Sequence, residues 1–164
     1  MLENSVPVID CIKEKCSTAI IKGKKCYDKG KCALYLDNCN DYIILKGETV
    51  RGIVGNLSEK VCDCLILITN NQRITHLVLV EIDDGQNKKP SHAKEQLIGG
   101  EEVAKKVIHK VCNYLDENYT VDYIFLYNNM SNYNQKYLTT HKLSIAGKDV
   151  HIKKSKHTFR CADN

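Results

Sequence analysis

Two apolar runs in the middle of the chain carry acidic residues at matching positions. The first run spans residues 62–68 and the second spans residues 74–80, and both are rich in β-branched and aliphatic side chains. A short polar link, residues 70–73, separates them. Apolar runs of this length joined by a short polar link predict an antiparallel hairpin.

The polar link sets the register of this hairpin. With the link as the loop, Thr69 lies opposite Ile74, and counting back along both strands places Asp63 opposite Val80 to within one residue. Glu81 follows Val80 directly, and side chains alternate between the two faces of a strand. The two carboxylates are therefore predicted to lie close together.

A pair of neighbouring carboxylates in an apolar hairpin needs compensation. Like charges at cross-strand positions destabilise a sheet, and partial burial adds a desolvation cost. Mg²⁺ offsets such a cost, because it takes carboxylate oxygens, keeps several waters and leaves room for a substrate phosphate. Asp63 and Glu81 are thus candidate metal ligands. The alternative is that both acids flank the strand ends in solvent, beside a lysine.

The remaining pattern predicts an α/β domain with a central mixed sheet. Helical spacing covers residues 8–22 and, after the N-cap Ser91, residues 92–118. The strand that follows the long helix is expected to run parallel to the Glu81 strand. Further strands are predicted at residues 41–46, 49–54, 121–127, 141–146 and 149–154.

The less periodic segments are predicted as irregular structure. Residues 24–39 read as a loop or short strand, and residues 128–140 as a loop or loose helix. The last ten residues are polar and are predicted to be disordered. Gly99 and Gly100 interrupt the long helix at a cost of about 1–2 kcal/mol, which predicts a close approach of the sheet or of a ligand.

The order of these motifs resembles the PD-(D/E)XK nuclease superfamily. Asp63 lies in a hydrophobic strand, Glu81 ends the next strand, and the following helix opens with Ala-Lys-Glu-Gln-Leu at residues 93–97. The resemblance covers residues 41–154 and implies a restriction-endonuclease-like fold. It implies that Asp63 and Glu81 are catalytic metal ligands, with the Ile82 carbonyl as a third ligand, and that Gln96 reaches the acids.

The chain departs from the superfamily at the catalytic lysine, which usually stands two residues after the Glu. That position holds Asp83, so either Asp83 is an additional ligand, or a lysine elsewhere has taken over, or catalysis has been lost. Lys88, Lys89 and Lys94 are near in sequence, and Lys94 is favoured because it begins the helix beside the site. Glu48 matches an extra acid that many members of the superfamily carry ahead of the Asp. The alternative is that Glu48 is a turn residue exposed to solvent.

The resemblance implies a metal-dependent endo- or exonuclease that uses Mg²⁺ or Mn²⁺ and acts on nucleic acid, on DNA rather than RNA. The alternative is a catalytically inactive nucleic-acid-binding or assembly protein with the same fold. Residues 142–160 contain six Lys or Arg against one Asp, which favours contact with phosphate backbones. A homodimer is an option, since enzymes that cut both strands are often dimers.

Length and cysteine content complete the expectations. The 164 residues fit a Cys-rich helical extension, residues 1–40, and a nuclease-like core, residues 41–164. The nine cysteines lack the close pairs of a structural zinc site, so Cys62, Cys64 and Cys112 are predicted to be buried small hydrophobes. The alternative for the N-terminal cysteines is partial disulfide bonding, if the protein comes from a hyperthermophile, whose intracellular proteins often contain disulfides. The first residues show no secretory signal and no apolar run spans a membrane, so a cytoplasmic protein is expected.

Overall fold

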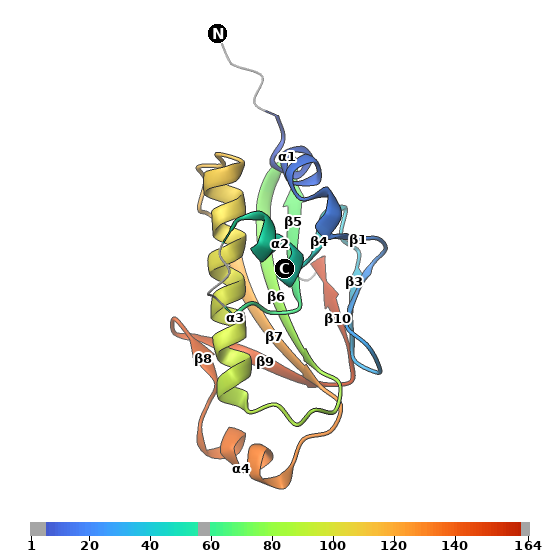
Figure 1. Ribbon diagram of the computed structural model, residues 1–164, viewed down its shortest axis with the longest axis vertical. Helices are drawn as coiled ribbons and strands as arrows, with labels where there is room; N and C mark the ends of the chain where they lie inside the picture. The colour runs from blue at the N-terminus through green and yellow to red at the C-terminus, as the bar shows by residue number, and fades with distance from the viewer. Residues whose placement is uncertain (1–5, 56–59, 162–164) are drawn as a thin grey trace.

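Seven strands form the main sheet of the protein, in the order β1-β4-β5-β6-β7-β9-β8. The computed structural model describes residues 6–55 and 60–161 (Figure 1). Strand β5 is antiparallel to both of its neighbours, β4 and β6, whereas β6, β7 and β9 run parallel. The strands are β1 (Ile20–Ile21), β4 (Asp41–Lys46), β5 (Cys64–Asn70), β6 (Arg73–Asp83), β7 (Thr120–Tyr127), β8 (Ser144–Ile145) and β9 (Lys148–Lys154).

The predicted α/β class with a mixed sheet is therefore confirmed, and β7 runs parallel to β6 as expected. Helices cover one face of the main sheet and a second, smaller sheet covers the other (Figure 1). The helical segments are α1 (Val8–Lys15), η1 (Ser17–Ala19), α2 (Gly47–Ile53), α3 (Pro90–Lys105), η2 (Lys106–Val111) and α4 (Asn132–Thr140). The small sheet has the order β10-β3-β2, from β10 (Lys156–Arg160), β3 (Ala33–Asp37) and β2 (Lys25–Tyr27).

Alternation along the central strands builds two hydrophobic layers. Odd-numbered residues of β5 and β6, such as Leu65 and Leu79, pack with Leu97 of α3. Even-numbered residues, such as Ile66 and Val78, face the small sheet. This explains why both strands read as continuous apolar runs. Among the described residues, no helix is long and apolar enough to cross a membrane.

Several expected elements are wrong in detail. Residues 49–54, expected as a strand, belong to α2, because the chain turns at Gly47 to pass over the Cys62 carbonyl. The long helix 92–118 ends as a π-helical segment at Val111. Residues 156–160, expected to be disordered, form β10 parallel to β3. The helix expected over residues 8–22 ends at Lys15. Of the two options for residues 128–140, a loop or a loose helix, the helix is confirmed for residues 132–140, which form α4.

The Cys-rich N-terminal region is part of the fold rather than a helical extension. Strand β1 pairs with β4 in the main sheet, and β2 and β3 build the small sheet. Neither pairing was predicted from the sequence, because β1 and β2 have only two and three residues, too few to show a periodic pattern. Residues 6–40 therefore help to build both layers of the described domain.

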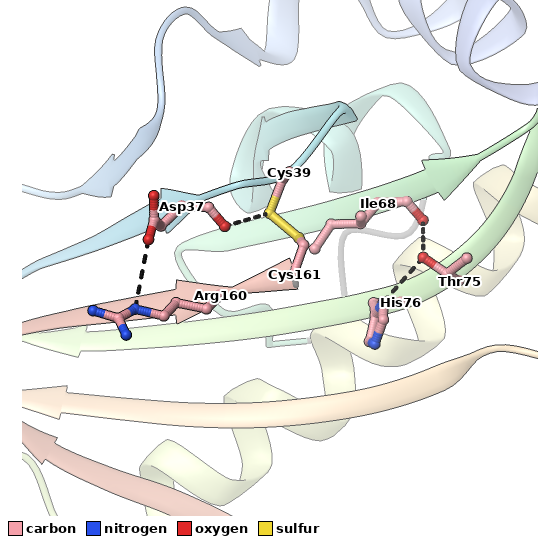
Figure 2. Close-up of a disulfide and its surroundings, with 7 residues drawn as sticks. All are labelled: Asp37, Cys39, Ile68, Thr75, His76, Arg160 and Cys161. Atoms are coloured by element: carbon pink, nitrogen blue, oxygen red, sulfur yellow. Dashed lines mark hydrogen bonds and ion pairs between the residues drawn. A yellow bond between two sulfur atoms is a disulfide. The ribbon is translucent and has the colours of Figure 1, made fainter. Parts of the chain in front are cut away.

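Three disulfides also tie the N-terminal region to the core: Cys11–Cys112, Cys26–Cys64 and Cys39–Cys161. Figure 2 shows the last of these, which fastens the segment after β3 to the segment after β10. The expectation that Cys64 and Cys112 are unpaired small hydrophobes is wrong, whereas Cys62 is a buried free thiol. Disulfides persist in oxidising compartments and in intracellular proteins of hyperthermophiles. The cytoplasmic location stays a prediction.

The two glycines in α3 allow the segment before β5 to lie against the helix. A Cβ at Gly99 would overlap the carbonyl oxygen of Lys60, and a Cβ at Gly100 would overlap Cys62 Sγ. On the other side of the same segment, a Cβ at Gly47 would overlap the Cys62 carbonyl oxygen. The predicted close approach is confirmed, and the glycines hold the chain that leads into Asp63 between α2 and α3.

We expect Gly99→Ala to lower the free energy of unfolding by about 1–3 kcal/mol or more, because the added methyl group meets backbone that must move. Gly52→Ala is the matched control, since no heavy atom outside its own helix lies within 4 Å of the added Cβ. This control is expected to be neutral or to stabilise by up to about 1 kcal/mol. Urea unfolding of the three proteins measures both effects, and equal stability of the two variants would contradict the close contact.

Candidate active site

A β-bulge in the hairpin determines which residues face each other at its far end. Thr69 lies opposite Ile74, as predicted, but Ile68 lies opposite His76, so β6 contains one extra residue, Thr75. The hydroxyl of Thr75 donates a hydrogen bond to the Ile68 carbonyl at 3.2 Å (Figure 2). The bulge shifts the register by one residue along the rest of the hairpin.

This shift places Asp63 directly opposite Glu81. The last paired residues of β5 and β6 are Cys64 and Val80, and both acids are the next residues outward. The Ile82 N–H donates to Asp63 Oδ2 at 2.7 Å, so it points toward β5, and the neighbouring Glu81 belongs to a non-hydrogen-bonded pair. Side chains approach each other most closely in such pairs. The predicted proximity of the two carboxylates is therefore confirmed.

The backbone of Ile82 also contributes to the site. The N–H and C=O of a strand residue point to the same edge of the strand, so the Ile82 carbonyl lies on the side where its N–H binds Asp63. The Ile82 carbonyl, which the resemblance implies as a third ligand, therefore lies on the β5 side of β6. Asp63, Glu81 and the Ile82 carbonyl gather at one end of the hairpin.

Burial makes the acid pair, Asp63 and Glu81, electrostatically unfavourable when both are charged. The Glu81 side chain is fully buried, and burial, followed by the Asp63 charge, raises its pKa to about 9. Burial also raises the pKa of Asp63. Glu81 Oε1 has no hydrogen-bond donor among the described groups. At neutral pH, a proton or a cation between the carboxylates would satisfy this oxygen.

Lys88 reaches the acid pair and forms an ion pair with Glu81 Oε2. Its backbone is fixed by Asp83, whose carboxylate accepts hydrogen bonds from the N–H groups of Gln86 at 2.7 Å and Lys88 at 2.6 Å. Gly85 N–H donates to the same carboxylate at 3.2 Å. Asp83 therefore shapes the loop that carries Lys88. The sequence Asp83-Asp84-Gly85 indicates a turn, but it does not show in which direction the Lys88 side chain points.

Lys94, the lysine favoured from the sequence, makes no contact with the acid pair among the interactions of the described residues. Lys94 and Gln96 are half-buried on α3, and neither side chain forms a hydrogen bond or ion pair with another described residue. Gln96 precedes Gly99 and Gly100 by three and four residues, which places it on the side of α3 that faces the segment leading to Asp63. Glu48 is exposed in the first turn of α2. Of the candidate lysines, only Lys88 is seen to contact an acid of the pair.

Two residues beside Asp63 were missed by the sequence analysis. A cavity of about 180 Å³ is lined by Asp63, Asp28 and Lys46, together with Ile21 and Tyr27. The charge of Asp28 adds to the rise in the pKa of Asp63, after burial. Asp28 follows β2, which pairs with β3 and is joined to β5 by the Cys26–Cys64 disulfide. No local sequence signal could have found it.

A magnesium or manganese ion fits the donor set of this site. Two carboxylates and one carbonyl suit an ion that keeps several of its waters. Glu81 Oε1 is buried and has no hydrogen-bond donor among the described groups, so it favours either a bound cation or a proton shared with Asp63. Within residues 6–55 and 60–161, no cluster of three or more His, Cys, Asp or Glu side chains forms a ready-made metal cage. Any bound ion would therefore depend on water or substrate for its remaining ligands.

Fold and site define an α/β protein with a buried acid pair and an adjacent lysine at one end of a hairpin. The chain matches no protein-family model, and neither the curated proteins nor the solved structures contain a match. The resemblance to the PD-(D/E)XK superfamily consequently rests on the motif residues and their order in the sequence.

Proposed function

We propose that the protein is a metal-dependent nuclease that hydrolyses phosphodiester bonds in nucleic acid, DNA in preference to RNA. The observation that carries the proposal is the buried acid pair with Lys88 against Glu81. Asp63, Glu81 and the Ile82 carbonyl would hold Mg²⁺ or Mn²⁺. When bound, this ion would polarise the scissile phosphate and lower the pKa of a coordinated water.

Lys88 supplies the positive charge that the superfamily takes from the lysine two residues after the Glu. Its ammonium group lies at the carboxylate of Glu81 and is held by the loop that Asp83 organises. From this position it would orient the attacking water and neutralise charge that grows on the phosphate oxygens. The water oxygen bonds to phosphorus, the bond to the leaving sugar oxygen breaks, and a phosphate monoester and a hydroxyl result.

Cleavage assays test this proposal directly. Single-stranded, duplex and branched DNA and single-stranded RNA would each be incubated with the protein in Mn²⁺ and, in parallel, in EDTA. We expect cleavage of at least one DNA substrate with Mn²⁺ and none in EDTA. Binding to nucleic acid with no cleavage of any of these substrates would refute the enzyme proposal and favour the inactive nucleic-acid-binding protein.

A further inference from the structure

Helix α4, which contacts the loop that carries Lys88, presents an aromatic stripe. Tyr133, Tyr137 and His141 follow one another at intervals of four residues, so they lie along one face of the helix and its C-terminal end. The Tyr137 ring stacks on His141 with 4.4 Å between ring centroids. Tyr133 is 76% exposed, which leaves its ring open to a further stacking partner.

A cavity of about 320 Å³ lies between this stripe and the start of α3. Its lining residues are Lys89, Pro90, Ser91, Tyr133, Asn134 and Tyr137, and none of them is acidic. Lys89 is the charged residue of this lining. The stretches of sequence that hold the lining residues, 89–91 and 133–137, contain Lys89 and Lys136 and no Asp or Glu. The cavity thus combines aromatic rings with a positive charge that no lining carboxylate offsets.

Hydrogen bonds connect this cavity to the loop that holds Lys88. Asn134 is buried in α4, and its Nδ2 donates to Asn87 Oδ1 at 2.9 Å and to the Lys88 carbonyl at 3.4 Å. The Ser131 N–H donates to the same Asn87 oxygen at 3.0 Å. Figure 1 shows α4 next to the loop between β6 and α3. A strand whose bases lie on α4 is therefore close to Lys88 and the acid pair.

We propose that the α4 cavity binds unpaired bases, and that the substrate class is single-stranded nucleic acid, including single-stranded ends or gaps. This inference rests on the proposed nuclease function for its catalytic meaning. Aromatic rings beside a positive charge are the usual combination for single strands, because every base has a face that stacks and every phosphate is negative. Bases in a duplex are stacked on one another and do not reach such rings.

Fluorescence anisotropy in EDTA tests the proposal without any cleavage. The probes are labelled 20-nucleotide oligo(dT), labelled oligo(rU) of the same length and a labelled 20-base-pair blunt duplex. We expect the wild-type protein to bind oligo(dT) at least about tenfold more tightly than the duplex. The double variant Tyr133→Ala/Tyr137→Ala is expected to lose about tenfold or more in affinity for oligo(dT), since each stacked base contributes on that scale.

The matched control is Tyr133→Phe/Tyr137→Phe, which keeps both rings and is expected to bind oligo(dT) within about twofold of the wild type. Circular dichroism checks that both variants keep the fold. Equal affinity for single strand and duplex, or an alanine variant that binds like the wild type, overturns the inference. Comparison of oligo(dT) with oligo(rU) shows whether the groove prefers DNA or accepts either strand.

Failure of this inference is distinguishable from failure of the proposed function. Single-strand binding that depends on the tyrosines, without cleavage in Mn²⁺, would refute the nuclease and leave the α4 cavity as a single-strand site. Cleavage of duplex and single strand at equal rates, unchanged by the tyrosine variants, would support the nuclease and refute the cavity. Each of these two results refutes one of the two proposals and leaves the other standing.

Discussion

Lys88→Ala is expected to lower the rate of Mn²⁺-dependent cleavage by about 100- to 1,000-fold, the usual effect of removing one group that stabilises transition-state charge. The reason is the position of the ammonium group against Glu81, where it would face the reacting phosphate. A group that acts mainly in the transition state lowers turnover and leaves ground-state binding nearly unchanged. Affinity for oligo(dT) in EDTA should therefore stay within about threefold of the wild type.

Lys94→Ala is the matched control. Lys94 lies near the start of α3, shortly after the loop that carries Lys88, but makes no polar contact with another described residue. Its cleavage rate should stay within about threefold of the wild type, as expected for a general phosphate contact. Single-turnover cleavage of the substrate found in the first assay measures both rates. A large loss in Lys94→Ala with normal cleavage by Lys88→Ala would return the catalytic role to the position favoured from the sequence.

Local patterns predicted the hairpin, its acids and the parallel strand that follows α3. These features follow from apolar runs, turn residues and alternation, which depend on short stretches of sequence. Gly99 and Gly100 were also informative, because two glycines inside a helix need a packing reason. The acid pair could therefore be found from sequence, although Thr75 was needed to bring Asp63 fully opposite Glu81.

The choice of lysine could not be predicted in the same way. Lys88 reaches Glu81 only because the Asp83 carboxylate binds three backbone N–H groups of the intervening loop. Loop shape of this kind depends on side-chain hydrogen bonds and on contacts from Asn134 of α4, which lies far along the chain. Asp83, at the position where the resemblance would place a lysine, is thus the residue that positions the loop.

The contribution of the N-terminal region was missed for a related reason. Asp28 approaches Asp63 because β2 is joined to β5 by a disulfide and packs within the small sheet. Long-range pairings of short strands leave almost no periodic signal in the sequence. The two acids of the site therefore come from one hairpin that the sequence predicts, whereas the groups that surround them come from distant parts of the chain.

The acid pair itself is expected to be required for metal binding. Asp63→Asn and Glu81→Gln should each weaken Mn²⁺ binding by at least about 100-fold, since loss of outer partners alone costs about 10- to 100-fold at metal sites. Glu48→Gln is the control, because Glu48 is exposed on α2, and it should bind Mn²⁺ like the wild type. Isothermal titration calorimetry measures all four proteins. Equal binding by all of them would exclude a metal site at the hairpin.

The pH dependence of the metal-free protein provides an independent check on the same pair. Because the pKa of Glu81 is raised to about 9, the folded state holds a proton that the unfolded chain releases above its ordinary pKa. The stabilisation is complete below that ordinary value and is lost as pH rises toward 9, at up to about 1.4 kcal/mol per pH unit. Mn²⁺ must displace this proton, so its affinity should increase over the same range.

Glu81→Gln removes the titrating group while keeping the size of the side chain. Its free energy of unfolding should therefore fall less steeply than that of the wild type between pH 6 and pH 9, and it should release no proton from this position. Urea unfolding at four or five pH values in EDTA measures both slopes. Parallel slopes for the two proteins would mean that Glu81 is already charged in the folded state, and Lys88 would then be its main partner in place of a proton or a metal ion.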